Sequence, residues 1–160
     1  MKTKFILHGG YPFGEIQIND NFFGEILKDS PNQSKILLVY FANKSDNVER
    51  YKTEDMEQLK SSDIVYFRGG HSDLILDKIK KYSNLDKLFK GKTIAGDSAG
   101  ANVLVKTFYS KSLGVTSGLG ILPIKLICHY HDDLRNKLDT IDQDLETIFL
   151  KEYQYKVIWI

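Results

Sequence analysis

The sequence predicts a single α/β domain in which a mostly parallel sheet lies between two layers of helices. Short apolar runs alternate along the chain with longer amphipathic segments, which is typical of β-α-β units. These runs are continuous rather than alternating, as in strands that are buried on both faces of a sheet. A chain of 160 residues suffices for one core and is too short for two ordinary domains. We therefore expect one domain over residues 1–160.

Each expected strand is a short apolar run, and each expected helix carries apolar residues at helical spacing. In chain order, the expected strands cover 5–7, 36–41, 64–67, 93–95, 126–128 and 155–160. The expected helices cover 21–28, 49–60, 72–82 and 101–109. Parallel sheets of this kind bind ligands beyond the carboxyl ends of their strands. Four polar residues follow such strand ends, namely His8, Arg68, Ser98 and His129.

Composition excludes several classes of partner. The formal net charge is +1, from 22 basic and 21 acidic residues, so no global field favours nucleic acid or an anionic membrane. The longest apolar run, 36–42, is far too short to span a membrane, and no secretory signal is recognised. The single Cys128 excludes an internal disulfide and suits a reducing compartment, so a cytoplasmic protein is expected. Residues 9–14 match neither common nucleotide-binding motif, and we expect no cofactor and no metal.

The most informative segment is Gly96-Asp97-Ser98-Ala99-Gly100, at the junction of an expected strand and an expected helix. A serine with glycine two positions before and after it, in this context, is typical of a nucleophile elbow. The serine must adopt a strained turn with positive φ, and flanking side chains would collide across that turn. The N-terminus of the following helix can then hold an oxyanion. Ser98 is the candidate nucleophile, and a tight structural turn is the alternative interpretation.

Two further segments complete a candidate hydrolase site. A glycine pair ending in Gly70 follows one strand and opens a helix, so Gly70 can donate one oxyanion hydrogen bond and Ala99 the other. His129 ends another strand, far enough after the serine for a helix, a loop and a return strand. It is the candidate general base, with His131 in reserve. A tight turn and a structural histidine are the respective alternatives.

Taken together, these segments resemble the dipeptidase E and cyanophycinase family of serine peptidases. The matching segments are 69–72, the serine segment 96–102 and the histidine segment 128–130, and the resemblance runs from about Lys4 to Tyr130. It implies a fold similar to the class I glutamine amidotransferase domain and hydrolysis of a small peptide substrate. It also implies that Ser98 is the nucleophile, that His129 is the base, and that Gly70 and Ala99 are the oxyanion donors.

This sequence departs from the family pattern in two places. The resemblance leads us to expect an acidic triad member between serine and histidine, but residues 99–128 contain no Asp or Glu. Glu15, Asp132 and Asp133 are the candidates for the missing carboxylate, unless the site is a Ser-His dyad. In addition, the stretch 43–62 fits one helix where relatives fit a longer helix and an extra strand. The expected fold is therefore a somewhat truncated version.

Substrate contacts and competing functions complete the expectations. Arg68 can clamp a substrate carboxylate because guanidinium binds carboxylates bidentately, and a structural ion pair is the alternative role for Arg68. His71 is a second candidate for binding the substrate.

A carboxylesterase of the hormone-sensitive-lipase type is one alternative function. It shares Gly-Asp-Ser-Ala-Gly and an upstream oxyanion motif that His8-Gly9-Gly10 mimics, but it needs a longer stretch of chain after the serine. A catalytically degenerate binding module on the same scaffold is the other alternative. The oligomeric state, including a homodimer, is left open.

Overall fold

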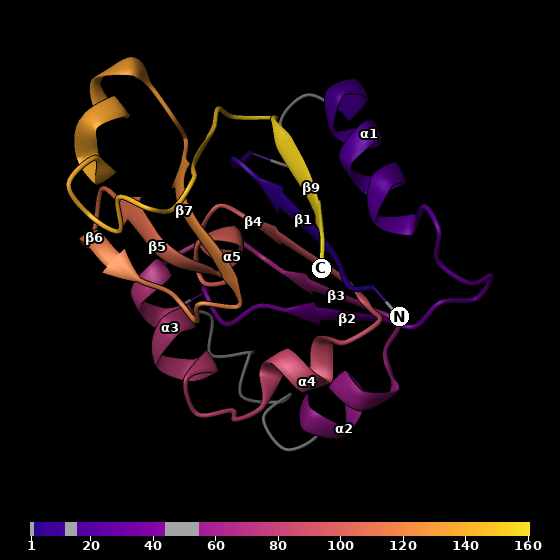
Figure 1. The fold of residues 1–160 in the computed structure, drawn as a ribbon. Helices are drawn as coiled ribbons and strands as arrows, with labels where there is room; N and C mark the ends of the chain where they lie inside the picture. The colour runs from indigo at the N-terminus through magenta and orange to yellow at the C-terminus, as the bar shows by residue number, and fades with distance from the viewer. Residues whose placement is uncertain (1, 12–15, 44–54) are drawn as a thin grey trace.

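The computed structural model describes residues 2–11, 16–43 and 55–160, and it places their strands in two sheets (Figure 1). The main sheet has the order β2-β3-β4-β1-β9, and the second sheet has the order β6-β5-β7-β8. The strands of the main sheet are β1 (Lys4–His8), β2 (Ile36–Val39), β3 (Ile64–Phe67), β4 (Thr93–Asp97) and β9 (Tyr155–Trp159). Those of the second sheet are β5 (Val105–Ser110), β6 (Gly114–Ser117), β7 (Leu122–Cys128) and β8 (Thr147–Leu150).

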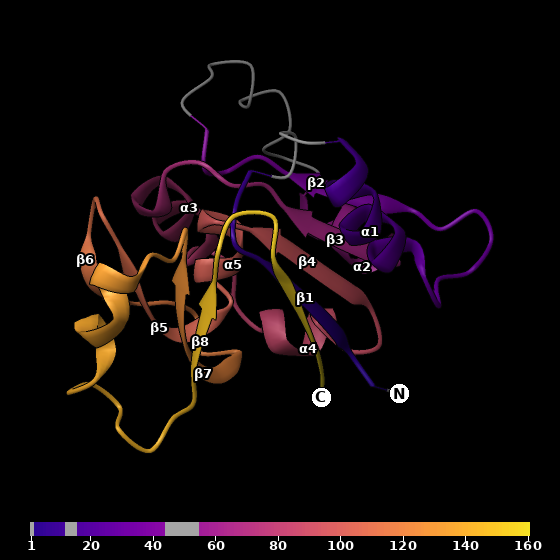
Figure 2. The same ribbon diagram turned by 90° about the horizontal axis from the view of Figure 1, so that it is seen from above.

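Helices cover both faces of the main sheet, which gives the three layers that the sequence predicts (Figure 2). The helices are α1 (Ile16–Leu27), α2 (Asp55–Ser61), α3 (Ser72–Ile79), α4 (Leu85–Phe89), α5 (Ala99–Asn102) and the 3-10 helix η2 (Asp132–Leu138). Successive side chains of a strand face opposite sides of the sheet. In β1, Ile6 packs in the cluster that contains α1, whereas Phe5 and Leu7 pack in the cluster that contains α3 and α4.

Four strands of the main sheet run parallel, and β9 pairs antiparallel with β1 at one edge. As predicted, β1, β3 and β4 are buried along their whole lengths. The prediction for 36–41 is wrong in its burial, because Ile36 and Leu38 are 47% and 49% exposed. The reason is topological: among the strands that the structure describes, β2 forms the other edge of this sheet and has a neighbour on one side only.

Two further predictions need correction in the segment that follows Ser98. The helix predicted over 101–109 is the short α5, after which the chain enters β5. Val105, Thr107 and Phe108 favour a strand, because β-branched and aromatic side chains fit a pleated, buried surface. The strand predicted at 126–128 exists as part of β7, but it belongs to the second sheet, where it pairs in parallel with both β5 and β8.

The ends of the expected helices shift as well. α1 begins before residue 21, and α3 ends at Ile79. α2 begins at Asp55, and residues 49–54 of the helix predicted over 49–60 lie outside the described residues.

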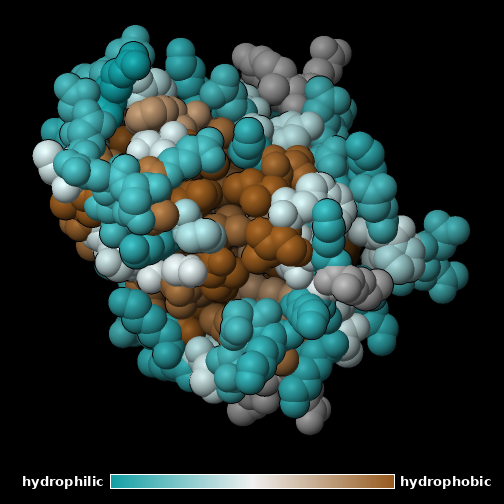
Figure 3. Space-filling model, viewed as in Figure 1, coloured by the Kyte–Doolittle hydropathy of each residue, from teal (hydrophilic) through white to brown (hydrophobic). Residues whose placement is uncertain are grey.

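In the view of Figure 3, apolar side chains gather near the centre of the face and hydrophilic ones surround them. In the described part of the chain, no helix has the length and apolar character that crossing a membrane requires.

Candidate active site

Ser98 lies in the sharp turn between β4 and α5, with the positive φ of 49° that a nucleophile elbow requires. Close contacts with main-chain atoms require that the two flanking residues, Gly96 and Gly100, be glycine. A Cβ on Gly96 would lie 2.5 Å from the carbonyl carbon of Gly100, and one on Gly100 would lie 2.0 Å from the carbonyl oxygen of Phe67. No side chain fits at either position, so the spacing in the sequence reflects a steric requirement of this turn.

His129 reaches the serine from the second sheet. It follows directly after β7, and its Nε2 lies 2.9 Å from Ser98 Oγ. Its backbone also has a positive φ, 50°, and its N–H donates a hydrogen bond of 2.9 Å to the carbonyl of Gly9. The structure therefore brings together the two residues that the sequence selects as nucleophile and base.

Among the described residues, the carboxylate that contacts this pair is that of Glu152, a residue that sequence analysis missed. Its Oε1 lies 3.3 Å from His129 Nδ1, opposite the nitrogen that faces the serine. Glu152 stands in the turn between β8 and β9, two residues past the end of β8. Because β8 runs parallel to β7, its carboxyl end lies at the same sheet edge as His129. Recognising residues 147–150 as a buried strand would have been the signal.

The three carboxylates that the sequence proposes are placed differently. Glu15 lies outside the described residues. Asp132 and Asp133 form the first turn of η2, and within residues 2–11, 16–43 and 55–160 neither forms a hydrogen bond with His129. The chain does turn after Tyr130, but into a 3-10 helix rather than back toward the imidazole.

The backbone N–H groups of Gly70 and Ala99 are the donors that the sequence predicts for an oxyanion hole. Among the described residues, neither Gly70 N–H nor Ala99 N–H donates a hydrogen bond to the protein. Both neighbours of Gly70 are held: Gly69 N–H donates to Asp97 Oδ1 at 3.0 Å and His71 N–H to the carbonyl of Ala42 at 2.8 Å. Gly70 itself has φ of 148°, and a Cβ there would lie 2.5 Å from the carbonyl oxygen of Ala42.

A buried carboxylate fixes the glycine loop relative to the elbow. Asp97, 2% exposed, accepts hydrogen bonds from the hydroxyl of Tyr66 at 2.6 Å, from Arg68 Nη1 at 2.8 Å and from Gly69 N–H at 3.0 Å. Burial, and then the negative charge of Asp97, raises the pKa of Tyr66 far above its usual range, so its hydroxyl stays a donor. Arg68 thus forms the structural ion pair that was the alternative to its role as a substrate clamp.

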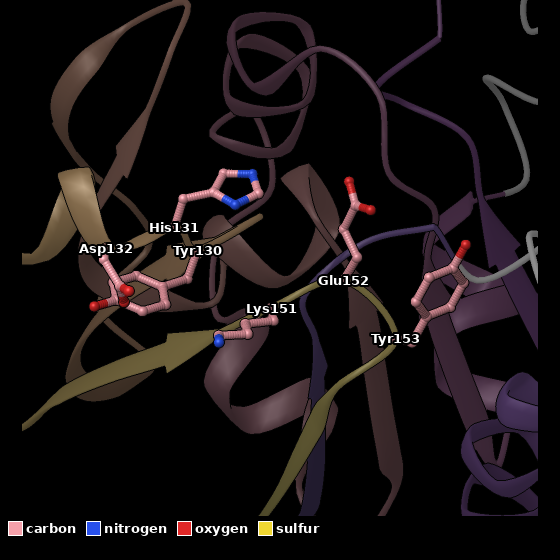
Figure 4. A pocket seen from close by; sticks show the side chains of 6 residues that line it. All are labelled: Tyr130, His131, Asp132, Lys151, Glu152 and Tyr153. Atoms are coloured by element: carbon pink, nitrogen blue, oxygen red, sulfur yellow. The ribbon is translucent and has the colours of Figure 1, made fainter.

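The remaining candidates lie around the same edge. His71 is exposed and directly precedes α3. A pocket next to His129 is lined by Tyr130, His131, Asp132, Lys151, Glu152 and Tyr153. Figure 4 shows His131 and Glu152 extending toward the same side, with Lys151 turned away from them. In the described ranges, no group of three or more His, Cys, Asp or Glu residues is placed to hold a metal ion.

Comparisons with known proteins bear on the family and the fold of this chain. The model of peptidase family S51 matches residues 42–158. No curated protein matches the sequence. A solved peptidase from an acI-B1 Actinobacterium is 20% identical, with a TM-score of 0.69 over 99% of this chain and 84% of that chain. A candidate peptidase E from Listeria monocytogenes EGD-e is 16% identical, with a TM-score of 0.63 over 100% of this chain and 98% of that chain. At these identities, the two structures show a shared fold.

Proposed function

Because this chain belongs to peptidase family S51, the dipeptidase E family of serine peptidases, we propose that Ser98, His129 and Glu152 form its catalytic triad. The observation that carries the proposal is one continuous chain of contacts. Ser98 Oγ lies 2.9 Å from one imidazole nitrogen of His129, and Glu152 Oε1 lies 3.3 Å from the other. This is the arrangement in which a base activates a nucleophile while a third group orients the base.

In the proposed mechanism, Ser98 Oγ attacks the scissile carbonyl carbon of a short peptide, and its proton moves to His129 Nε2. Glu152 accepts the hydrogen bond from His129 Nδ1–H, which fixes the tautomer and stabilises the imidazolium that forms. The N–H groups of Gly70 and Ala99 donate to the developing oxyanion.

The tetrahedral intermediate then collapses as His129 delivers its proton to the leaving amine, which leaves an acyl-enzyme on Ser98. A water molecule gives a proton to His129 and attacks the acyl carbon. The second intermediate releases the carboxylic acid and restores the hydroxyl of Ser98.

Neither alternative function is favoured by the positions of its key residues. The esterase alternative uses His8-Gly9-Gly10 as an oxyanion hole, but both glycine N–H groups are engaged. Gly9 N–H donates to the carbonyl of Gln154 at 2.8 Å, and Gly10 N–H donates to His8 Nδ1 at 3.1 Å. The binding-module alternative was motivated by a lost triad acid, and the 3.3 Å contact of Glu152 with His129 supports Glu152 as that acid.

A thiol mechanism is also disfavoured, because Cys128 is buried. Burial, and then the charge of Asp97, raises the pKa of its thiol far above the usual range, so the nucleophilic thiolate does not form near neutral pH. A buried, protonated thiol also fits the reducing, cytoplasmic compartment that we propose for this chain.

The proposal is tested with a fluorophosphonate probe, which reacts covalently with activated serines. We expect labelling of the wild-type protein at Ser98 and none in Ser98→Ala, with Ser110→Ala as a control outside the site. Parallel assays of short peptides, including peptides that begin with Asp, and of p-nitrophenyl esters then separate peptidase from esterase activity. Equal labelling of wild type and Ser98→Ala, or no labelling and no hydrolysis by wild type, would overturn the proposal.

A further inference from the structure

The segment His8-Gly9-Gly10 at the end of β1 takes no part in the proposed mechanism, yet it is hydrogen-bonded to the backbone of Ser98, of His129 and of Tyr153, the residue after Glu152. Resting on the proposed function, we infer that this turn positions the triad, with His8 as the positioning side chain. It acts by holding Gly10 against the imidazole of His129 and by anchoring the three catalytic loops through consecutive carbonyl groups.

Three consecutive carbonyls of the turn each accept one hydrogen bond from a different catalytic loop. The carbonyl of His8 accepts from Ser98 N–H at 2.9 Å, and that of Gly9 accepts from His129 N–H at 2.9 Å. The carbonyl of Gly10 accepts from the N–H of Tyr153, the residue after Glu152, at 3.1 Å. One short segment is therefore bonded to the backbone at, or next to, every triad residue.

The backbone that these carbonyls hold is strained. Ser98, His129 and Tyr153 have φ of 49°, 50° and 66°, a region that residues other than glycine rarely occupy. Such conformations persist only where the surrounding structure over-determines them, and they are often found at functional sites. The hydrogen bond that each of the three loops donates to a carbonyl of the turn supplies that constraint.

Gly10 also contacts the imidazole of His129 directly. Its φ is 129°, and a Cβ built on it would lie 2.1 Å from His129 Cε1 and 2.5 Å from Nε2. The main chain of Gly10 is thus packed against the ring at a distance that only glycine allows. The ring cannot turn toward β1, and its Nε2 stays directed at Ser98.

His8 holds Gly10 in that place. The ring is fully buried, it packs on Phe22 with ring centroids 4.4 Å apart, and its Nδ1 accepts the hydrogen bond from Gly10 N–H. Only a neutral imidazole can accept at Nδ1. Burial lowers the pKa of His8 to about 4, so this acceptor is present at neutral pH.

The first test places a methyl group between the turn and the ring. In Gly10→Ala we expect kcat and the rate of fluorophosphonate labelling at Ser98 to fall about a hundredfold or more, with little change in KM, because the base is displaced by an ångström or so. Gly114→Ala is the control, since that glycine also has a positive φ, 68°, but its Cβ would meet nothing within 4 Å. The control should label at the wild-type rate.

The second test leaves the glycines unchanged. The amide oxygen of His8→Asn lies where Nδ1 lies and can accept from Gly10 N–H, whereas His8→Leu removes the acceptor and keeps apolar volume. We expect His8→Leu to lose activity about a hundredfold and His8→Asn to recover most of it, both measured below their unfolding temperatures. Equal loss in both variants would show a packing role and overturn the inference.

A structural measurement separates this inference from the proposed function. In crystals of Gly10→Ala, we expect the distance from Ser98 Oγ to His129 Nε2, which is 2.9 Å in the wild type, to exceed hydrogen-bond range. An unchanged distance would overturn the inference whatever the activity. If the wild type is neither labelled nor active, the proposed function fails, and this distance still decides whether the turn positions the histidine.

Discussion

At the scale of single residues, the proposed triad draws its three side chains from three separate loops. Ser98 is set by the elbow after β4, His129 by the end of β7, and Glu152 by the turn after β8. Each of these loops has a positive φ at the functional residue or immediately after it. Local strain of this kind is tolerated where tertiary contacts compensate for it, as the turn after β1 does here.

The assignment of Glu152 leads to the first prediction at this scale. Glu152→Gln keeps the shape of the side chain and removes its charge, so the histidine loses the partner that fixes its tautomer. We expect kcat to fall about a thousandfold with an unchanged fold, measured on the best peptide substrate. Asp133→Asn is the matched control and should behave like wild type. A full rate in Glu152→Gln, or a comparable loss in the control, would contradict the assignment.

At the scale of elements, the loop after β3 and the elbow after β4 form one unit because Asp97 bonds both. Asp97 ends β4, next to the serine, and it contacts Tyr66, Arg68 and Gly69 at the end of β3. β3 and β4 are also paired in parallel, with Phe67 opposite Gly96. The proposed oxyanion donor Gly70 is therefore placed by the strand that carries the nucleophile.

This connection predicts a large effect on stability for Asp97→Asn. The substitution removes the buried anionic partner of Arg68. It also replaces one carboxylate oxygen, an acceptor, with an NH2 group that faces hydrogen-bond donors. We expect the free energy of unfolding to fall by about 3 kcal/mol, measured by denaturant titration. Asp77→Asn removes the exposed ion pair with Lys81 and should change stability little. If both variants lose the same stability, the network around Asp97 does not hold the loop.

At the scale of the whole molecule, the site lies where the two sheets meet (Figure 1). The main sheet supplies Ser98 and the His8-Gly9-Gly10 turn, while the second sheet supplies His129 and the loop of Glu152. The hydrogen bonds from His129 and Tyr153 to the turn cross between the sheets. If the proposed triad is correct, catalysis and the packing of the two sheets are coupled through the same residues.

This coupling predicts how stability depends on pH. The buried ring of His8 has a pKa lowered from 6.5 to about 4, mainly by burial and also by His129, while Asp97 and the side chain of Asn19 oppose the shift. The unfolded chain therefore binds the extra proton first. Between about pH 6.5 and 4, stability should fall with falling pH, by as much as roughly 3 kcal/mol from this residue.

The measurement compares the unfolding free energy of wild type and His8→Asn at pH 7 and pH 4.5. Because asparagine does not titrate, the variant should lose less stability than wild type over this interval, although its carboxylates titrate as before. Parallel pH profiles for the two proteins would show that His8 is not the group responsible.

The sequence by itself determined the features whose geometry is local. Gly96 and Gly100 flank the serine because main-chain atoms within a few residues, or on the adjacent strand, leave no room for a Cβ. The central strands were recognisable because burial on both faces demands continuous apolar runs. Ser98 and His129 could be selected because each ends such a run, and ligand sites lie beyond strand ends.

Tertiary structure decided the rest. The segment 101–109 has apolar residues that fit a helix or a buried strand equally, and pairing with β6 and β7 decides for the strand β5. Glu152 could not be assigned from spacing, because the short run 147–150 can suggest a strand before it but not which strand that one pairs with. It reaches His129 only because β8 pairs in parallel beside β7, a long-range contact that no local pattern encodes. The same holds for His8-Gly9-Gly10: its composition suggests an oxyanion motif, and only the surrounding hydrogen bonds show that its N–H groups are already engaged.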